Sequence, residues 1–80
     1  IVGKGVTFDS GGSNLKPSGS METMKSDMSG AAAVYAVVRL AAVRKLPVNI
    51  HAYIPLVENI IGGDAMRPGD IISSLSGKSV

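Results

Sequence analysis

Residues 28–57 read MSGAAAVYAVVRLAAVRKLPVNIHAYIPLV, and this stretch decides the fold class. Its three consecutive alanines and long apolar run predict a helix from about Met28 to Lys45, and the basic pair at its end suits a helix C-terminus. Pro47 ends the helix, because proline lacks the N–H that would continue the hydrogen-bond pattern. The alternating pattern that follows predicts a strand over Val48–Val57, with one apolar face and one polar face.

A second strand is predicted before the helix. The short β-branched run Val2–Phe8 ends at Asp9, and a loop rich in serine, glycine and proline follows over Ser10–Lys25. A strand, a helix of this length and another strand form one βαβ unit with parallel strands. The fold class is therefore α/β, and we expect a βαβ segment of a larger mixed sheet flanked by helices.

The last part of the chain is predicted to be mostly irregular. Glu58–Asp70 is a loop, since it contains a Pro-Gly turn and two further glycines. Ile71–Leu75 and a strand beginning near Val80 are predicted to form a hairpin across Ser76–Ser79.

The composition indicates that these residues belong to a larger unit. Of the 80 residues, 45% are apolar, yet a chain this short buries only about 60% of the surface that its unfolded form exposes. Only Arg39 interrupts the apolar character of the predicted helix before Arg44, so we expect that helix to be buried on most sides. We therefore expect residues 1–80 to be one segment of a longer protein.

Composition also excludes several classes of protein. The chain has no cysteine, which excludes a disulfide scaffold and a cysteine-ligated zinc site. Its longest apolar run, Ala31–Val38, is far short of the roughly 20 residues that span a bilayer, so no membrane partner is expected. The net charge of +2 and the scattered basic residues do not indicate a nucleic-acid partner.

Two reactive atoms compete within the tetrad DSGG at positions 9–12. The tetrad surrounds the nucleophile of trypsin-like proteases, which would make Ser10 the reactive residue. That interpretation requires a histidine base, and the only histidine, His51, lies on the polar face of a predicted strand. Trypsin-like enzymes are also β-barrels with the serine last in chain order, so the central helix and the early position of Ser10 both contradict this interpretation.

Two nucleotide-binding motifs are also incomplete. Gly77-Lys78-Ser79 matches the end of a phosphate-binding loop, but the glycine required five residues earlier is Ile72. Gly3-Lys4-Gly5 begins a dinucleotide fingerprint, but its third glycine would fall at Phe8.

Four charged residues near the first strand are candidates for a metal site: Lys4, Asp9, Lys16 and Asp27. Ligands bind at the carboxyl ends of strands in open α/β sheets, which is where Asp9 lies. Structural roles remain open for each residue. Asp27 is also a candidate helix cap, as is Ser29, and Asp9 a candidate turn residue. Lys4 shares strand parity with apolar residues and has the opposite parity to Asp9, so a flat strand would separate the two.

Several stretches of the sequence match one family of enzymes. They are VGKGVTFDSGG, Lys16, MKSDMSGAAAVY, LPVN, ENIIGG and RPGDIISSLSGKSV. With them the sequence resembles the leucyl aminopeptidase family of cytosolic metalloaminopeptidases over essentially its whole length, and the intervals between the four charged residues are the family's own.

The resemblance implies a role for each site residue. Asp9 would bridge two divalent metal ions, zinc or manganese, and Lys4 and Asp27 would ligate one of them. Lys16 would be catalytic, because its ammonium would stabilise the oxyanion formed from the scissile carbonyl. Met24 would line the pocket for the substrate's N-terminal side chain. Lys4 can ligate only as a neutral amine, and we expect the dications and burial to depress its pKa.

The resemblance also implies a metal-dependent aminopeptidase that releases N-terminal residues such as leucine from peptides. The 80 residues would be part of the C-terminal catalytic domain of a cytoplasmic homo-hexamer. The family's second ligand cluster, Asn-Thr-Asp-Ala-Glu-Gly-Arg, is absent from them. We therefore expect the 80 residues to be inactive by themselves. The alternative is a non-catalytic family member that serves as an assembly or DNA-binding component.

Overall fold

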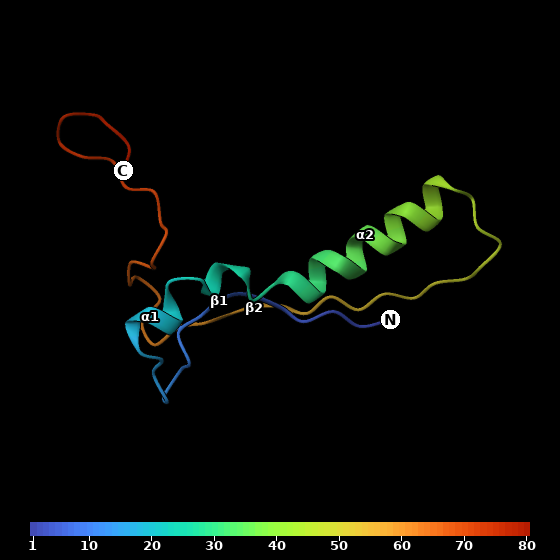
Figure 1. Cartoon of the computed structure of the whole chain (residues 1–80), viewed down its shortest axis with the longest axis horizontal. Coiled ribbons are helices and arrows are strands. Elements are labelled where there is room, and N and C mark those ends of the chain that lie inside the picture. The colour runs from blue at the N-terminus through green and yellow to red at the C-terminus, as the bar shows by residue number, and fades with distance from the viewer.

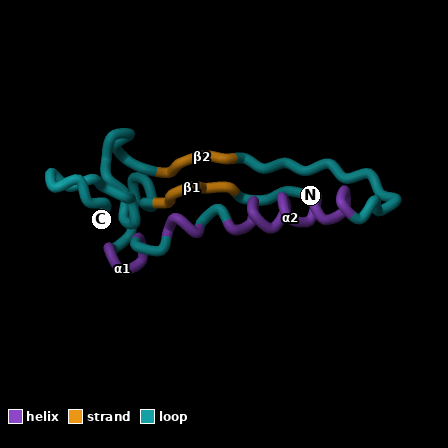
Figure 2. Tube along the Cα trace, turned by 90° about the horizontal axis from the view of Figure 1, so that it is seen from above, coloured by secondary structure: helices purple, strands orange, loops and turns teal.

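The computed structural model describes residues 1–80 and contains two strands, two α-helices and one short 3₁₀ helix (Figure 1). In chain order these are β1 (Gly5–Asp9), α1 (Ser18–Met21), the 3₁₀ helix η1 (Met24–Ser26), α2 (Ser29–Val43) and β2 (Leu56–Asn59). β1 and β2 pair in parallel, and α2 lies between them in the chain and runs alongside the segments that lead into the two strands (Figure 2). The α/β class and the βαβ order are therefore confirmed.

One extra residue interrupts the register of β1. Gly5 and Val6 pair with Leu56 and Val57, whereas Asp9 pairs with Asn59, so β1 advances three residues while β2 advances two. Such a bulge turns the side chains that follow it to the other face of the strand. In a regular strand the side chains of Lys4 and Asp9 would lie on opposite faces, and the bulge removes this separation.

Both predicted strands are too long. The first begins at Gly5 rather than Val2, and the second covers Leu56–Asn59 rather than Val48–Val57. Before them the chains run side by side but form a single bridge, between Val2 and Tyr53. Pro55 has no N–H to donate, so the ladder is interrupted there.

The helix prediction is confirmed except at its ends. α2 runs from Ser29 to Val43, and its termination depends on Lys45, which adopts a positive φ of 51°. The Lys45 N–H donates to the Ala42 carbonyl and the Leu46 N–H to the Ala41 carbonyl. This pair of bonds is a Schellman motif, so the helix ends before Pro47 is reached.

Two short helices lie in the stretch that is predicted to be a loop, Ser10–Lys25. α1 begins after Pro17, whose carbonyl accepts hydrogen bonds from the Ser20 and Met21 N–H groups. Each helix is about one turn long, so neither has a periodic pattern that the sequence could reveal. A hairpin near the C-terminus is confirmed, with Ser73 bridging Ser79 and Ile72 and Val80 exchanging backbone hydrogen bonds. Its bounds differ from the prediction, because Leu75 lies in the turn and Ser79 in the paired part.

The expectation that the helix is buried on most sides is wrong for these 80 residues. In α2 only Ala31 and Ala41 are buried, and Phe8 of β1 is the one large side chain that is fully covered. The Cα radius of gyration is 16.7 Å, compared with about 12 Å for a compact domain of this length. One sheet face with two strands is too small to cover the apolar surface of a 15-residue helix.

Residues Ser18–Val43 have the length and hydropathy of a membrane-spanning helix by composition alone, which is weak evidence for one. The structure divides this stretch into α1, η1 and α2. The longest of them, α2, has 15 residues, fewer than the roughly 20 that a bilayer requires.

Two glycines allow the chain before β1 to approach the start of α2. A Cβ on Gly3 would lie 2.5 Å from the Gly30 carbonyl oxygen and 2.9 Å from Ala31 Cα. A Cβ on Gly30 would lie 3.2 Å from the Lys4 nitrogen. The contact places Lys4 beside the residues that lead into α2.

We expect Gly3→Ala to destabilise the full-length protein by about 1–3 kcal/mol, because its methyl group has no space between two backbone segments. Urea denaturation measures the change. Gly19→Ala is the matched control, since a Cβ at Gly19 meets nothing within 4 Å. Equal stability of the two variants would show that the close approach is not required.

A candidate metal site beside β1

Lys4 and Asp27 are brought together by the packing of the chain before β1 against α2. The Ala31 N–H in the first turn of α2 donates to the Lys4 carbonyl over 2.8 Å. On the side-chain level, Lys4 Nζ donates to Asp27 Oδ1 at 2.9 Å and lies 2.8 Å from Oδ2. The carboxylate of Asp27 therefore forms an ion pair with Lys4.

Neither proposed capping residue caps α2 with its side chain. The N-cap position is Met28, without a side-chain cap hydrogen bond, and the Ser29 hydroxyl donates to the Ser26 carbonyl instead. The capping alternative for Asp27 and Ser29 is therefore wrong.

The second oxygen of Asp27 has an unused acceptor position. Asp27 Oδ2 is buried and accepts no hydrogen bond, although the Lys4 ammonium is 2.8 Å away. The two observations differ because the distance satisfies an ion pair while the angles do not satisfy a hydrogen bond. A buried carboxylate oxygen without a donor is suited to a cation.

Asp9 is oriented by contacts on one of its two oxygens. Oδ1 accepts hydrogen bonds from the Gly11 N–H at 2.9 Å and from Asn59 Nδ2 at 2.7 Å. Oδ2 lies 3.4 Å from Lys16 Nζ. The Gly11 bond is the contact expected of a turn residue. Asp9 can therefore be a turn residue and also lie at the candidate site.

These contacts keep Asp9 ionised. The Gly11 N–H lowers the pKa of Asp9 most, followed by the Asn59 amide, and the Lys16 charge adds to them. Each favours the charged carboxylate, which is the form that binds a metal ion.

The loop between Asp9 and Lys16 folds back on itself, so that Lys16 lies beside Asp9. The Lys16 N–H donates to the Ser10 carbonyl over 2.9 Å. Gly11 has a φ of 91°, and a Cβ there would lie 2.3 Å from the Asn14 carbonyl oxygen. Only glycine fits this turn, so the Gly-Gly pair serves the loop that positions Lys16.

The side chain of Lys4 is more exposed than expected for a residue that shares a strand face with apolar residues. Its side chain is 61% exposed, and the lowering of its pKa by burial is outweighed by its contact with Asp27. The hydrogen bond that Lys4 donates to Asp27 raises the pKa of Lys4, and the charges of Asp27 and Asp9 add to this effect. Lys4 is therefore an ammonium in this arrangement, and binding a metal requires displacement of its proton. The effect of dications on the pKa stays a prediction.

Ser10 has none of the surroundings that a nucleophile needs. It is 3% exposed, and its hydroxyl oxygen accepts a hydrogen bond from the Gly12 N–H at 3.3 Å. His51 is exposed, and its hydrogen bond is made by its backbone carbonyl, which accepts from the Ile1 ammonium. These observations support Asp9, rather than Ser10, as the reactive residue of the tetrad.

Met24, the predicted substrate-pocket residue, is half-buried at the start of η1. The four hollows of the surface are lined mainly by apolar residues of α2 and the loops. None of them is lined by Met24 or by the four charged candidates. The pocket role of Met24 stays a prediction.

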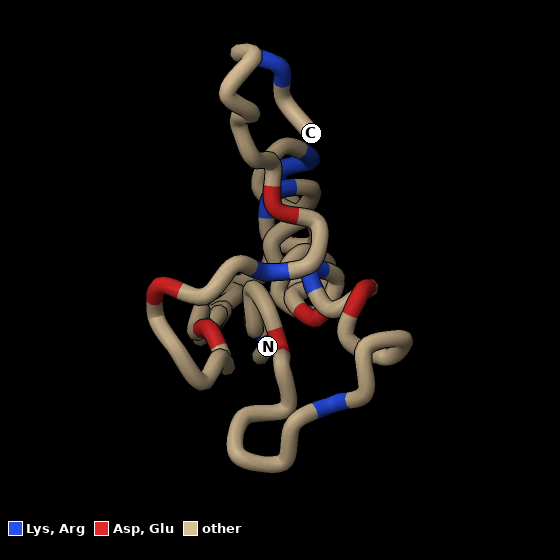
Figure 3. The backbone as a smooth tube through the Cα atoms, turned by 90° about the vertical axis from the view of Figure 1, so that its left-hand side faces the viewer, with Lys and Arg blue, Asp and Glu red and all other residues tan.

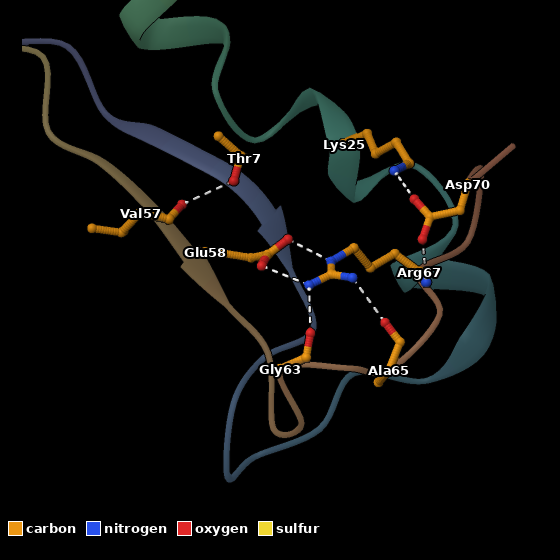
Figure 4. A network of polar contacts seen from close by, with 8 residues as sticks. All are labelled: Thr7, Lys25, Val57, Glu58, Gly63, Ala65, Arg67 and Asp70. Carbon is orange, nitrogen blue, oxygen red and sulfur yellow. Dashed lines mark hydrogen bonds and ion pairs between the residues drawn. The ribbon is translucent and has the colours of Figure 1, made fainter.

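Ion pairs between loops stabilise the position of η1, and the sequence did not indicate them. Arg67 binds the Glu58 carboxylate through two nitrogens, and its backbone N–H donates to Asp70 (Figure 4). The other oxygen of Asp70 accepts from Lys25 of η1. The network ties η1, which precedes Asp27, to the loop after β2. Basic and acidic residues are interspersed at the end of the molecule that faces the viewer in Figure 3, whereas Arg39, Arg44 and Lys45 follow one another along the chain without an acidic residue between them.

The donor set is sufficient for part of a metal site. No three Asp, Glu or His side chains in residues 1–80 are grouped closely enough to bind a metal ion. Lys4, Asp9 and Asp27 supply two carboxylates and one amine around β1. They fit a divalent metal that also receives ligands from other residues.

Comparison with known proteins gives consistent results. The model of the "cytosol aminopeptidase family, catalytic domain" matches residues 1–80. A relative from Halorhodospira halophila, named "Probable cytosol aminopeptidase", is 59% identical over the whole chain, and one from Micrococcus luteus with the same name is 55% identical. The chain covers 16% of the length of each.

Solved structures show the same likeness. The crystal structure of cytosol aminopeptidase from Coxiella burnetii matches 99% of the chain with a TM-score of 0.74 and 46% identity. The "bottromycin maturation enzyme BotP in complex with Mn" matches 98% with a TM-score of 0.70 and 50% identity. The chain covers 17% of each of these two chains.

Proposed function

Because the chain belongs to the cytosol aminopeptidase family, we propose that the full-length protein is a leucyl aminopeptidase that releases N-terminal residues such as leucine from peptides. One observation carries the proposal. Two pairs of a lysine and an aspartate, Lys4 with Asp27 and Lys16 with Asp9, lie beside one strand, and the charge of Asp9 acts on Lys4. These four residues would supply part of the set that the reaction requires.

The proposed cofactor is a pair of divalent metal ions, zinc or manganese. Lys4, Asp9 and Asp27 would bind them, together with residues outside this chain. Asp27 Oδ2, which is buried and accepts no hydrogen bond, supports this assignment, as does the likeness to BotP, an enzyme whose structure is a complex with Mn. Bound divalent metals supply Lewis acidity and lower the pKa of water.

The two lysines have different proposed roles. Lys4 gives up its proton and acts as a ligand, whereas Lys16 keeps its charge and stabilises the oxyanion of the substrate. The location of Lys16 supports this role, because its Nζ lies 3.4 Å from Asp9 Oδ2 and its side chain remains one-third exposed. Met24 is proposed to contact the N-terminal side chain of the substrate.

The proposed setting is a cytoplasmic homo-hexamer acting on peptides, with the 80 residues forming part of its C-terminal catalytic domain. The names of the curated relatives support the cytosolic location. We propose no membrane or nucleic-acid partner. No observation favours the alternative of a non-catalytic assembly or DNA-binding component.

We expect the full-length protein to hydrolyse leucine p-nitroanilide and to lose this activity after treatment with a chelator. Zinc or manganese should restore it, because the carboxylates and the lysine amine are the proposed ligands of a divalent metal ion. Absorbance at saturating substrate measures the rate. An N-acetylated substrate is the control, since an exopeptidase should not cleave it. Cleavage of both substrates, or activity that survives the chelator, would contradict the proposal.

A further inference from the structure

Asn59 is a polar residue that contacts the candidate site and has no role in the proposed function. It is the last residue of β2 and pairs in register with Asp9 at the end of β1. Its side chain donates from Nδ2 to Asp9 Oδ1 at 2.7 Å. Its carbonyl accepts the Ser10 N–H at 2.8 Å. Asn59 therefore contacts the turn that carries Asp9 through its backbone and its side chain.

One orientation of the Asn59 amide is favoured. Gly12 adopts a φ of 68°, and a Cβ there would lie 3.0 Å from Asn59 Oδ1. The opposite amide orientation would place Oδ1 against the carboxylate of Asp9, where two acceptors repel each other. The amide is therefore oriented with its N–H toward Asp9.

Because of this contact, the two oxygens of Asp9 have different partners. Oδ1 is saturated by two donors, the Gly11 N–H and the Asn59 amide. Oδ2 is 3.4 Å from Lys16 and accepts no hydrogen bond from the backbone. Without Asn59 the Gly11 N–H would be the only hydrogen-bond donor left to Oδ1, and the carboxylate could turn more freely about its last bond.

We propose that Asn59 is a positioning residue that sets the orientation of the Asp9 carboxylate, so that one oxygen stays available to the metal ion. The inference rests on the proposed function. Asn59 does not touch the metal or the substrate, and it acts through Asp9. Partners of this kind typically change metal affinity or activity by about 10- to 100-fold when they are removed.

The test is the affinity of the full-length protein for zinc and for manganese, measured by competition with a chromogenic chelator. Asn59→Ala removes the donor, and Asn59→Asp keeps the shape but replaces the donor with an acceptor. We expect both to bind metal about 10- to 100-fold more weakly, with kcat falling at saturating metal and KM for the peptide unchanged. The matched control is Asn49→Ala, because Asn49 is exposed and makes no side-chain hydrogen bond.

The result separates the two proposals. If wild type binds metal and the Asn59 variants bind it as tightly as Asn49→Ala, the role of Asn59 is refuted while the proposed function stands. If wild type binds neither metal, both fail. Thermal unfolding of the metal-free variants is measured in parallel. Should Asn59→Ala not fold, the isosteric Asn59→Asp decides the outcome.

Discussion

We expect Lys16→Ala to lower kcat of the full-length protein by about 100- to 1000-fold, the usual effect of removing a donor to an oxyanion. The reason is that Lys16 reaches the site through the tight Gly11 turn, which aims its ammonium beside Asp9 without making it a metal ligand. An interaction that forms only in the transition state lowers kcat and leaves KM nearly unchanged. Steady-state kinetics with leucine p-nitroanilide measure both constants.

Metal content is the second measurement on Lys16→Ala. It should equal that of wild type when determined by atomic emission, since no ligand has been removed. Lys78→Ala is the control, because Lys78 lies exposed in the C-terminal hairpin, away from the site. If Lys16→Ala loses its metals, or retains kcat, the proposed role is wrong.

Lys4→Ala should give the opposite pattern, with loss of bound metal. Its amine is one of three donors beside β1, and Asp27 would be left with a buried carboxylate oxygen and no cation next to it. Removal of a residue that only supports a metal ligand typically lowers metal affinity by about 10- to 100-fold. We expect a larger decrease for Lys4→Ala, because a ligand itself is removed. Activity should recover in part at high metal concentration, as it would not for Lys16→Ala.

The comparison of the two lysine variants decides between their roles. Atomic emission after dialysis against a fixed free metal concentration gives the occupancy of each. Equal occupancy in Lys4→Ala and Lys16→Ala would contradict the assignment of Lys4 as a ligand. It would also leave the ion pair between Lys4 and Asp27 with a structural role alone.

Local patterns in the sequence predicted the elements that depend on local interactions. The alanine-rich run predicted α2 to within two residues at either end. The hairpin beyond Ile71 was predicted because its turn residues are contiguous. The lengths of the strands were not predictable in this way. A strand ends where its partner stops accepting hydrogen bonds, and that partner lies about 50 residues away.

By itself, the sequence determined the α/β class, the family, and the four charged residues with their spacing, because helix propensity and motifs are properties of contiguous residues. Only the tertiary structure decided how those four residues meet. The bulge in β1 turns Asp9 relative to Lys4, and parallel pairing brings Asn59 onto Asp9. The close approach at Gly3 and Gly30 places Lys4 against Asp27. These contacts join residues that are separated by 23 or 50 positions, and no local preference encodes them.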